Sequence, residues 1–69
     1  MKIIVNGEER FLEAEVLVTD YVKSLDLDPE TVVVEVDGRI ITRQDYQSTL
    51  LLDGAEVELI RFIGGGSRC

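Results

Sequence analysis

Three consecutive glycines at positions 64–66 stand just before the last residues of the chain, Ser67, Arg68 and Cys69. Glycine loses more conformational entropy on folding than any other residue, so a run of three resists incorporation into a packed element. The glycines therefore raise the first functional question about the chain. They form either a frayed end or a segment that must fit into a narrow space.

The rest of the sequence offers no conventional acid–base or nucleophilic catalyst. It contains no histidine, which excludes a Ser–His or Cys–His pair. The carboxylate pairs Glu13/Glu15 and Glu56/Glu58 are spaced i, i+2 in or beside predicted strands, and solvated strand faces explain them. We therefore expect no catalytic residue among these groups, and local chemistry alone leaves the function open.

Metal and phosphate sites are also poorly supported by the spacing of the candidate ligands. Asp26, Asp28 and Glu30 lack the spacing and the central glycine of a calcium loop, so a charged loop explains them better. The glycine run is not followed by the Gly-Lys-Ser/Thr of a phosphate-binding loop. We expect neither a bound metal nor a bound cofactor.

The single cysteine, Cys69, cannot form an intramolecular disulfide, and a zinc site would need clustered cysteines or histidines. With only Arg68 as a cation beside it, Cys69 is expected to be a bystander or a disposable residue rather than a nucleophile. Nothing in the sequence demands an oligomer, so we expect the free protein to be a monomer.

Length and charge limit the partners. At 69 residues the chain forms one domain with a small core, and its net charge of −7 would repel nucleic acid. This acidity favours a larger protein partner with a basic face. The apolar run in residues 1–5 is too short for a signal peptide or a membrane span, so we expect a cytoplasmic protein without membrane contact.

Two hairpins and one helix are predicted in the first two thirds of the chain. Asn-Gly at 6–7 and Asp-Gly at 37–38 each join two strand-like segments, and 31–36 reads as a central strand. A helix is predicted within 16–27, with Thr19 as a possible cap and Asp28-Pro29 as its end. Its apolar face comprises Val18, Tyr21, Val22 and Leu25.

The last strand is predicted to carry the chain toward the glycines. Residues 44–52 show no clean period, and a turn at 53–54 leads into the strand 55–63. Alternation directs Val57 and Leu59 inward and Ile60 and Phe62 outward. The outward pair is either covered by the irregular stretch or forms an apolar docking patch.

The order of the predicted strands and the helix along the whole chain predicts a two-layer α+β fold, with the helix packed on one face of a sheet.

Read together, VVVEVDGRIITRQDY (32–46) and LLDGAEVELIRFIGGG (51–66) resemble the ThiS family, the sulfur-carrier proteins of thiamine biosynthesis, which are ubiquitin-like β-grasp proteins. The resemblance covers the whole chain and depends on the order and spacing of the pieces, including an aromatic residue at Tyr46. It implies a mixed sheet of four to five strands with one helix packed across it and with the first and last strands adjacent and parallel. It also implies a β-grasp domain at 1–63 and a flexible glycine tail at 64–69.

The resemblance further implies how such a protein works, as a carrier that partner enzymes act on and that is not itself an enzyme. The carboxylate of a terminal glycine is adenylated with ATP on a partner enzyme of the ThiF type and is converted to a thiocarboxylate. The sulfur comes through a cysteine desulfurase, and a thiazole synthase of the ThiG type consumes it. Carried over to this chain, Gly64, Gly65 and Gly66 form the arm, Gly66 carries the sulfur with Gly65 as second choice, and Ile60 and Phe62 dock the partner.

The chain departs from the family at its end, because Ser67, Arg68 and Cys69 follow the glycines and would have to be removed, we suggest by a protease. Carriers for other acceptors, including homocysteine-forming and siderophore-type systems, have such extensions, and this leaves the acceptor open. The molybdopterin-synthase small subunit is a weaker match, since it tends to have Pro-Pro where this chain has Arg61-Phe62. A binding module that never activates its tail is the alternative of a different class.

Overall fold

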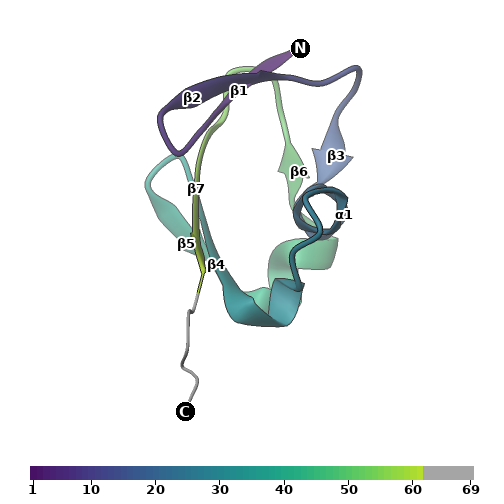
Figure 1. The fold of residues 1–69 in the computed structure, drawn as a ribbon, viewed down its shortest axis with the longest axis vertical. Helices are drawn as coiled ribbons and strands as arrows, with labels where there is room; N and C mark the ends of the chain where they lie inside the picture. Colours follow the sequence, from purple (N-terminus) through teal and green to yellow (C-terminus); the bar gives the residue numbers. More distant parts are fainter. Residues whose placement is uncertain (62–69) are drawn as a thin grey trace.

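The computed structural model describes residues 1–61, and the predicted site residues beyond them lie outside that range. The described chain forms a five-stranded sheet with an α-helix across one of its faces, and a separate pair of very short strands (Figure 1). The elements in chain order are β1 (Lys2–Val5), β2 (Glu8–Phe11), β3 (Val16–Leu17), α1 (Val18–Ser24), the 3₁₀ helix η1 (Pro29–Thr31), β4 (Val32–Val36), β5 (Arg39–Ile41), the 3₁₀ helix η2 (Arg43–Gln47), β6 (Leu50–Leu51) and β7 (Glu56–Arg61).

Both predicted hairpins are confirmed. β1 pairs antiparallel with β2, and β4 pairs antiparallel with β5. Each turn has two residues with positive φ: Asn6 at 51° with Gly7 at 81°, and Asp37 at 52° with Gly38 at 84°. Two successive positive φ values give the tight turn that matches the twist of the flanking strands, and Asn, Asp and Gly tolerate them best.

The order of the main sheet is β2-β1-β7-β4-β5, so the last strand is its centre. β1 and β7 run parallel, and β4 and β7 run antiparallel. This mixed sheet, with the first and last strands adjacent, is the arrangement that the β-grasp resemblance implies. The segment predicted as the central strand, β4, is an interior strand, but β7 occupies the middle position.

The helix is shorter than predicted at both ends. Residues 16–17 form β3 instead of its first turn, and Leu17 takes the cap position with extended dihedrals and no side-chain cap hydrogen bond. Thr19 lies inside the helix, so its prediction as a cap is wrong. The apolar face is right for Val18, Tyr21 and Val22, which are all buried.

α1 also ends earlier than predicted, and the end is set by Asp26 rather than by Pro29. Leu25 is the C-cap and remains 42% exposed, so its inclusion in the buried face is wrong. Asp26 then adopts φ 61°, which no α-helix continues through. Pro29 does not end α1 but begins η1, where the Asp28 carboxylate accepts a hydrogen bond from the backbone N–H of Glu30 at 2.9 Å.

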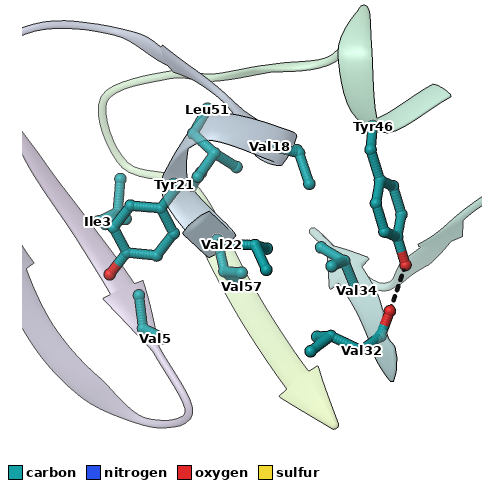
Figure 2. Close-up of a cluster of buried hydrophobic side chains, with 11 residues drawn as sticks. Ile3, Val5, Val18, Tyr21, Val22, Val32, Val34, Tyr46, Leu51 and Val57 are labelled. Carbon is teal, nitrogen blue, oxygen red and sulfur yellow. Dashed lines mark hydrogen bonds between the residues drawn. The ribbon is translucent and has the colours of Figure 1, made fainter. Parts of the chain in front are cut away.

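The stretch predicted to be irregular contains two elements. It holds η2 and then β6, which pairs antiparallel with β3. Tyr46 anchors it, because the hydroxyl of this buried side chain donates to the carbonyl oxygen of Val32 at 2.6 Å (Figure 2). The stretch therefore covers the helix side of the sheet, and not the outward side of β7.

The core lies between α1 and the sheet, and Figure 2 shows its side chains converging from both layers. Its buried members are Ile3, Val5, Val18, Tyr21, Val22, Val32, Val34, Tyr46, Leu51, Ala55 and Val57. None of the helices within residues 1–61 is long and apolar enough to cross a membrane. No described element covers the other face of the sheet, which is the face that β7 presents outward (Figure 1).

Candidate functional site

The candidate site is the end of β7 together with the uncovered face of the sheet around it. β7 pairs with β1 only near its start, at Glu56 and Val57, and with β4 up to Arg61, which lies opposite Val32. The last described residue is therefore fixed by the centre of the sheet.

The side chain of Asn6 extends the contact between β1 and β7 beyond their paired residues. Its Oδ1 accepts a hydrogen bond from the backbone N–H of Leu59 at 2.8 Å, and its Nδ2 donates to the Leu59 carbonyl oxygen at 3.4 Å. The backbone N–H of Asn6 also donates to the carbonyl oxygen of Val57 at 2.8 Å. This turn residue thereby holds β7 immediately before Ile60, which the sequence analysis did not foresee.

Ile60 lies where alternation predicts it, on the uncovered face. It is 50% exposed and stands directly opposite Val33 of β4, which is half-buried. Ile40 of β5, 68% exposed, lies on the same face beside Glu35. The apolar patch of the site thus consists of Ile60, Val33 and, further from the end of β7, Ile40.

Carboxylates surround this apolar patch. Glu35 of β4 is directly opposite Glu58 of β7, and Glu56 lies two residues before Glu58 on the same face. The salt bridges found within residues 1–61 join other pairs, Lys2–Glu9, Arg10–Glu8 and Arg43–Glu30, so none neutralises these three glutamates. Like charges directly opposite each other on neighbouring strands are unfavourable. A basic group on a partner would relieve that repulsion.

Glu35 and Val33 were missed by the sequence analysis. Their outward direction follows from alternation within 32–36, but their pairing with β7 is a contact between segments more than twenty residues apart in sequence. Only the register of that pairing brings Glu35 to Glu58 and Val33 to Ile60. The turn residue Asp37 also supports this face, because its carboxylate accepts from the backbone N–H of Glu56 at 2.9 Å.

The remaining predicted site residues lie outside the described part of the chain. These are Phe62, the glycines Gly64, Gly65 and Gly66, and the extension Ser67, Arg68 and Cys69. Of the predicted site, the structure thus places Ile60 alone. Among residues 1–61, no group of three or more His, Cys, Asp or Glu side chains is arranged to hold a metal ion.

Comparison with known proteins gives a family for nearly the whole chain. The profile of the ThiS family matches residues 3–66. A crystal structure of the thiamine biosynthesis protein ThiS from Geobacter metallireducens superimposes with a TM-score of 0.82 at 32% identity, over 96% of this chain and 100% of that one. A solution structure of a thiamine biosynthesis protein from the same organism gives a TM-score of 0.80 at 30% identity, over 100% of this chain and 92% of that one.

The curated relatives are larger proteins. A thiazole synthase of Paramagnetospirillum magneticum is 37% identical over 67 residues, which cover 97% of this chain and 21% of that protein. A thiazole synthase of Magnetococcus marinus is 35% identical over 66 residues, which cover 96% of this chain and 20% of that protein. The chain therefore spans about a fifth of the length of these two relatives.

Proposed function

The chain belongs to the ThiS family, and on that basis we propose that it is a sulfur carrier of thiamine biosynthesis rather than an enzyme. The observation that carries the proposal is the extent of the family match. It starts at residue 3, within β1, includes all later strands and continues through the glycine run to residue 66. The match thus joins the β-grasp fold to the segment whose chemistry the carrier needs.

The chemistry we propose takes place on Gly66 after Ser67, Arg68 and Cys69 have been removed by a protease. An adenylating enzyme of the ThiF type uses ATP to activate the freed carboxylate as an acyl adenylate. A persulfide that a cysteine desulfurase forms from cysteine attacks the acyl carbon and displaces AMP. A second thiol then attacks the resulting acyl disulfide, forms a disulfide with the desulfurase-derived sulfur atom and releases the thiocarboxylate. Glycines have no Cβ, so they can extend through a narrow channel and bring the acyl carbon close to a partner's reacting groups.

The uncovered face of the sheet is proposed to dock the adenylating enzyme. Ile60 and Val33 supply an apolar contact next to the end of β7, with Phe62 as its proposed continuation. Glu35 and Glu58 lie beside this contact and favour a partner with lysine or arginine residues there. Because β7 is the central strand, docking here would hold the start of the tail at a fixed distance from the partner's active site.

A thiazole synthase of the ThiG type is the proposed acceptor of the sulfur. Two relatives that match nearly the whole chain carry the name thiazole synthase, and the match occupies about a fifth of each. A carrier-like segment within such a protein supports the idea that carrier and synthase act together. Here the synthase would be a partner that binds the carrier and consumes its thiocarboxylate.

Adenylation by a partner enzyme tests the proposal with variants of a chain that ends at Gly66. We expect this chain to support ATP–pyrophosphate exchange by the enzyme. The Gly66→Ala variant should lose most of this exchange activity, because its Cβ would obstruct the reacting carbon. Ile60→Asp should weaken binding to the enzyme by about tenfold or more, because docking would bury the new charge. Phe11→Asp is the matched control. Phe11 is 75% exposed and lies opposite Lys2, on the same face but at the other end of the sheet.

Normal exchange with Gly66→Ala would contradict the assignment of the reacting carboxylate. Equal effects of Ile60→Asp and Phe11→Asp would contradict the docking surface while leaving the carrier function in place.

A further inference from the structure

A cleft opens on the helix side of the sheet, at the end of the core opposite the β3–β6 pair. Its volume is about 310 Å³. Its apolar walls come from Leu25 and Leu27, which follow α1, and from Val5 and Leu59 of the sheet. The polar groups of the same cleft come from Asn6, Glu8, Arg10, Tyr21 and Arg61. None of these residues belongs to the docking surface on the other face.

The cleft exists because β2 gives the core no apolar side chain. The residues of β2 that share a face with the buried Ile3 and Val5 are Arg10 and Glu8. The helix ends at Ser24, before it could cover this end of the sheet. As a result Leu25 remains 42% exposed, and Leu27 and Leu59 are only partly buried. An exposed apolar floor beside charged groups is typical of a binding site.

The hydroxyl of Tyr21 has no hydrogen-bond partner in the described part of the chain, although the residue is only 5% exposed. Figure 2 shows the ring beside Ile3 and Val5, with the hydroxyl pointing away from the other labelled core side chains. Burial raises the pKa of this phenol, and the nearby Arg10 guanidinium opposes that effect. Buried hydroxyls are normally satisfied, so this one is available to a ligand oxygen.

Two arginines and one glutamate line the cleft, so its charge is locally positive in a chain of net charge −7. Arg10 donates to the Glu8 carboxylate at 2.6 Å and to the Glu9 carbonyl oxygen at 3.2 Å, which leaves other N–H groups of its guanidinium unused. Arg61 forms no side-chain hydrogen bond or salt bridge with residues 1–61. A guanidinium presents a fork of donors that fits a carboxylate.

We propose that this cleft binds a segment of a partner protein that places a branched apolar side chain next to a carboxylate. The side chain fills the space between Leu25, Leu27 and Leu59, and the carboxylate accepts hydrogen bonds from Arg61 and the Tyr21 hydroxyl. The volume of about 310 Å³ is at the lower end of the range for small-molecule pockets, about 300–1,000 Å³, and leaves room for one apolar side chain and the carboxylate beside it. The inference stands apart from the sulfur-carrier proposal, because no residue of the glycine tail takes part.

Titration of the full-length chain with short peptides, followed by backbone amide shifts in NMR, tests this site. The probe is acetyl-Gly-Leu-Asp-Gly-amide, compared with a Leu-Asn peptide that lacks the charge and an Ala-Asp peptide that lacks the apolar side chain. We expect the Leu-Asp peptide to bind about tenfold more tightly than either comparison peptide. The shifts should be confined to the neighbourhood of Tyr21, Leu25 and Leu59.

Variants then assign the contacts. Arg61→Gln should weaken binding of the Leu-Asp peptide by about tenfold and Tyr21→Phe by about threefold. Arg39→Gln is the control, because Arg39 is an exposed residue of the opposite edge strand β5. The amide spectrum of each variant shows whether it remains folded.

Three results would overturn the proposal. They are equal affinity for the Leu-Asp and Leu-Asn peptides, equal effects of Arg61→Gln and Arg39→Gln, and affinity for free isovalerate as high as for the peptide. The last result would assign the cleft to a small metabolite instead of a protein segment.

Discussion

The side chain of Asn6 hydrogen-bonds both backbone polar groups of Leu59, accepting from the N–H at 2.8 Å and donating to the carbonyl oxygen at 3.4 Å. The two residues are 53 positions apart, and the contact joins the first hairpin turn to the strand that leads to the tail. A residue placed by its turn conformation thus also fixes β7 two residues before Arg61, the last residue that the structure describes.

Asn6→Gly should lower the free energy of unfolding by about 1 kcal/mol, because glycine keeps the positive φ but removes both side-chain hydrogen bonds. Urea denaturation measures this change, and hydrogen exchange of the Leu59 amide locates it. Asn6→Ala should cost more, since alanine is also strained at φ 51°. Unchanged protection of the Leu59 amide in Asn6→Gly would show that the side chain does not hold β7.

Glu58→Gln should raise the free energy of unfolding by about 0.2–0.5 kcal/mol at low salt, because it removes the repulsion from Glu35 directly opposite. Added salt screens surface charges, so the gain should shrink as ionic strength rises. Glu15→Gln is the control, since Glu15 is exposed in a loop outside the sheet. An equal gain in both variants would attribute the effect to net charge instead of the Glu35–Glu58 pair.

Tyr46→Phe should lower the free energy of unfolding by about 1–2 kcal/mol, because it removes a buried hydrogen bond of 2.6 Å to the Val32 carbonyl oxygen. Tyr21→Phe is a matched control: both tyrosines are buried, but the Tyr21 hydroxyl has no partner within residues 1–61. It should change stability by less than about 0.5 kcal/mol. Equal losses in thermal or urea unfolding would mean that the Tyr46 hydrogen bond does not anchor η2.

Stability should fall as the pH rises above about 10, in a way that depends on Tyr21. Burial raises the pKa of this phenol above 10.0 in the folded protein, with Arg10 offsetting part of the effect. Above the pKa that Tyr21 has in the unfolded chain, the unfolded chain has lost the phenol proton that the folded protein still holds. A further increase in pH therefore favours unfolding until the pH passes the pKa of Tyr21 in the folded protein. The free energies of unfolding of the unsubstituted protein and of Tyr21→Phe, measured across this pH range, test this prediction. The same pH dependence in both proteins would contradict it.

What the sequence predicted correctly is mainly what neighbouring residues determine. Asn-Gly and Asp-Gly fix the two hairpins through their positive φ values, and alternation in 55–61 correctly placed Val57 inward and Ile60 outward. The position of β7 in the sheet came from the family resemblance instead, since no local pattern specifies which strand lies at the centre.

The failures concern contacts over long distances and short elements. β3 and β6 consist of two residues each and exist only because they pair with each other, so no periodicity announces them. α1 ends at Ser24, and the positive φ of Asp26, which prevents its continuation, is not revealed by a pattern of apolar residues. The Glu35–Glu58 pair and the cleft around Tyr21 likewise depend on register and on where α1 stops.

The most direct test of the sulfur-carrier proposal is the intact mass of the untagged protein isolated from its own cells while the pathway is active. The proposal predicts a chain that ends at Gly66, with part of the population carrying sulfur in place of one terminal oxygen. A chain that always continues through Cys69 and never carries sulfur would contradict it, and would favour a binding module that does not activate its tail.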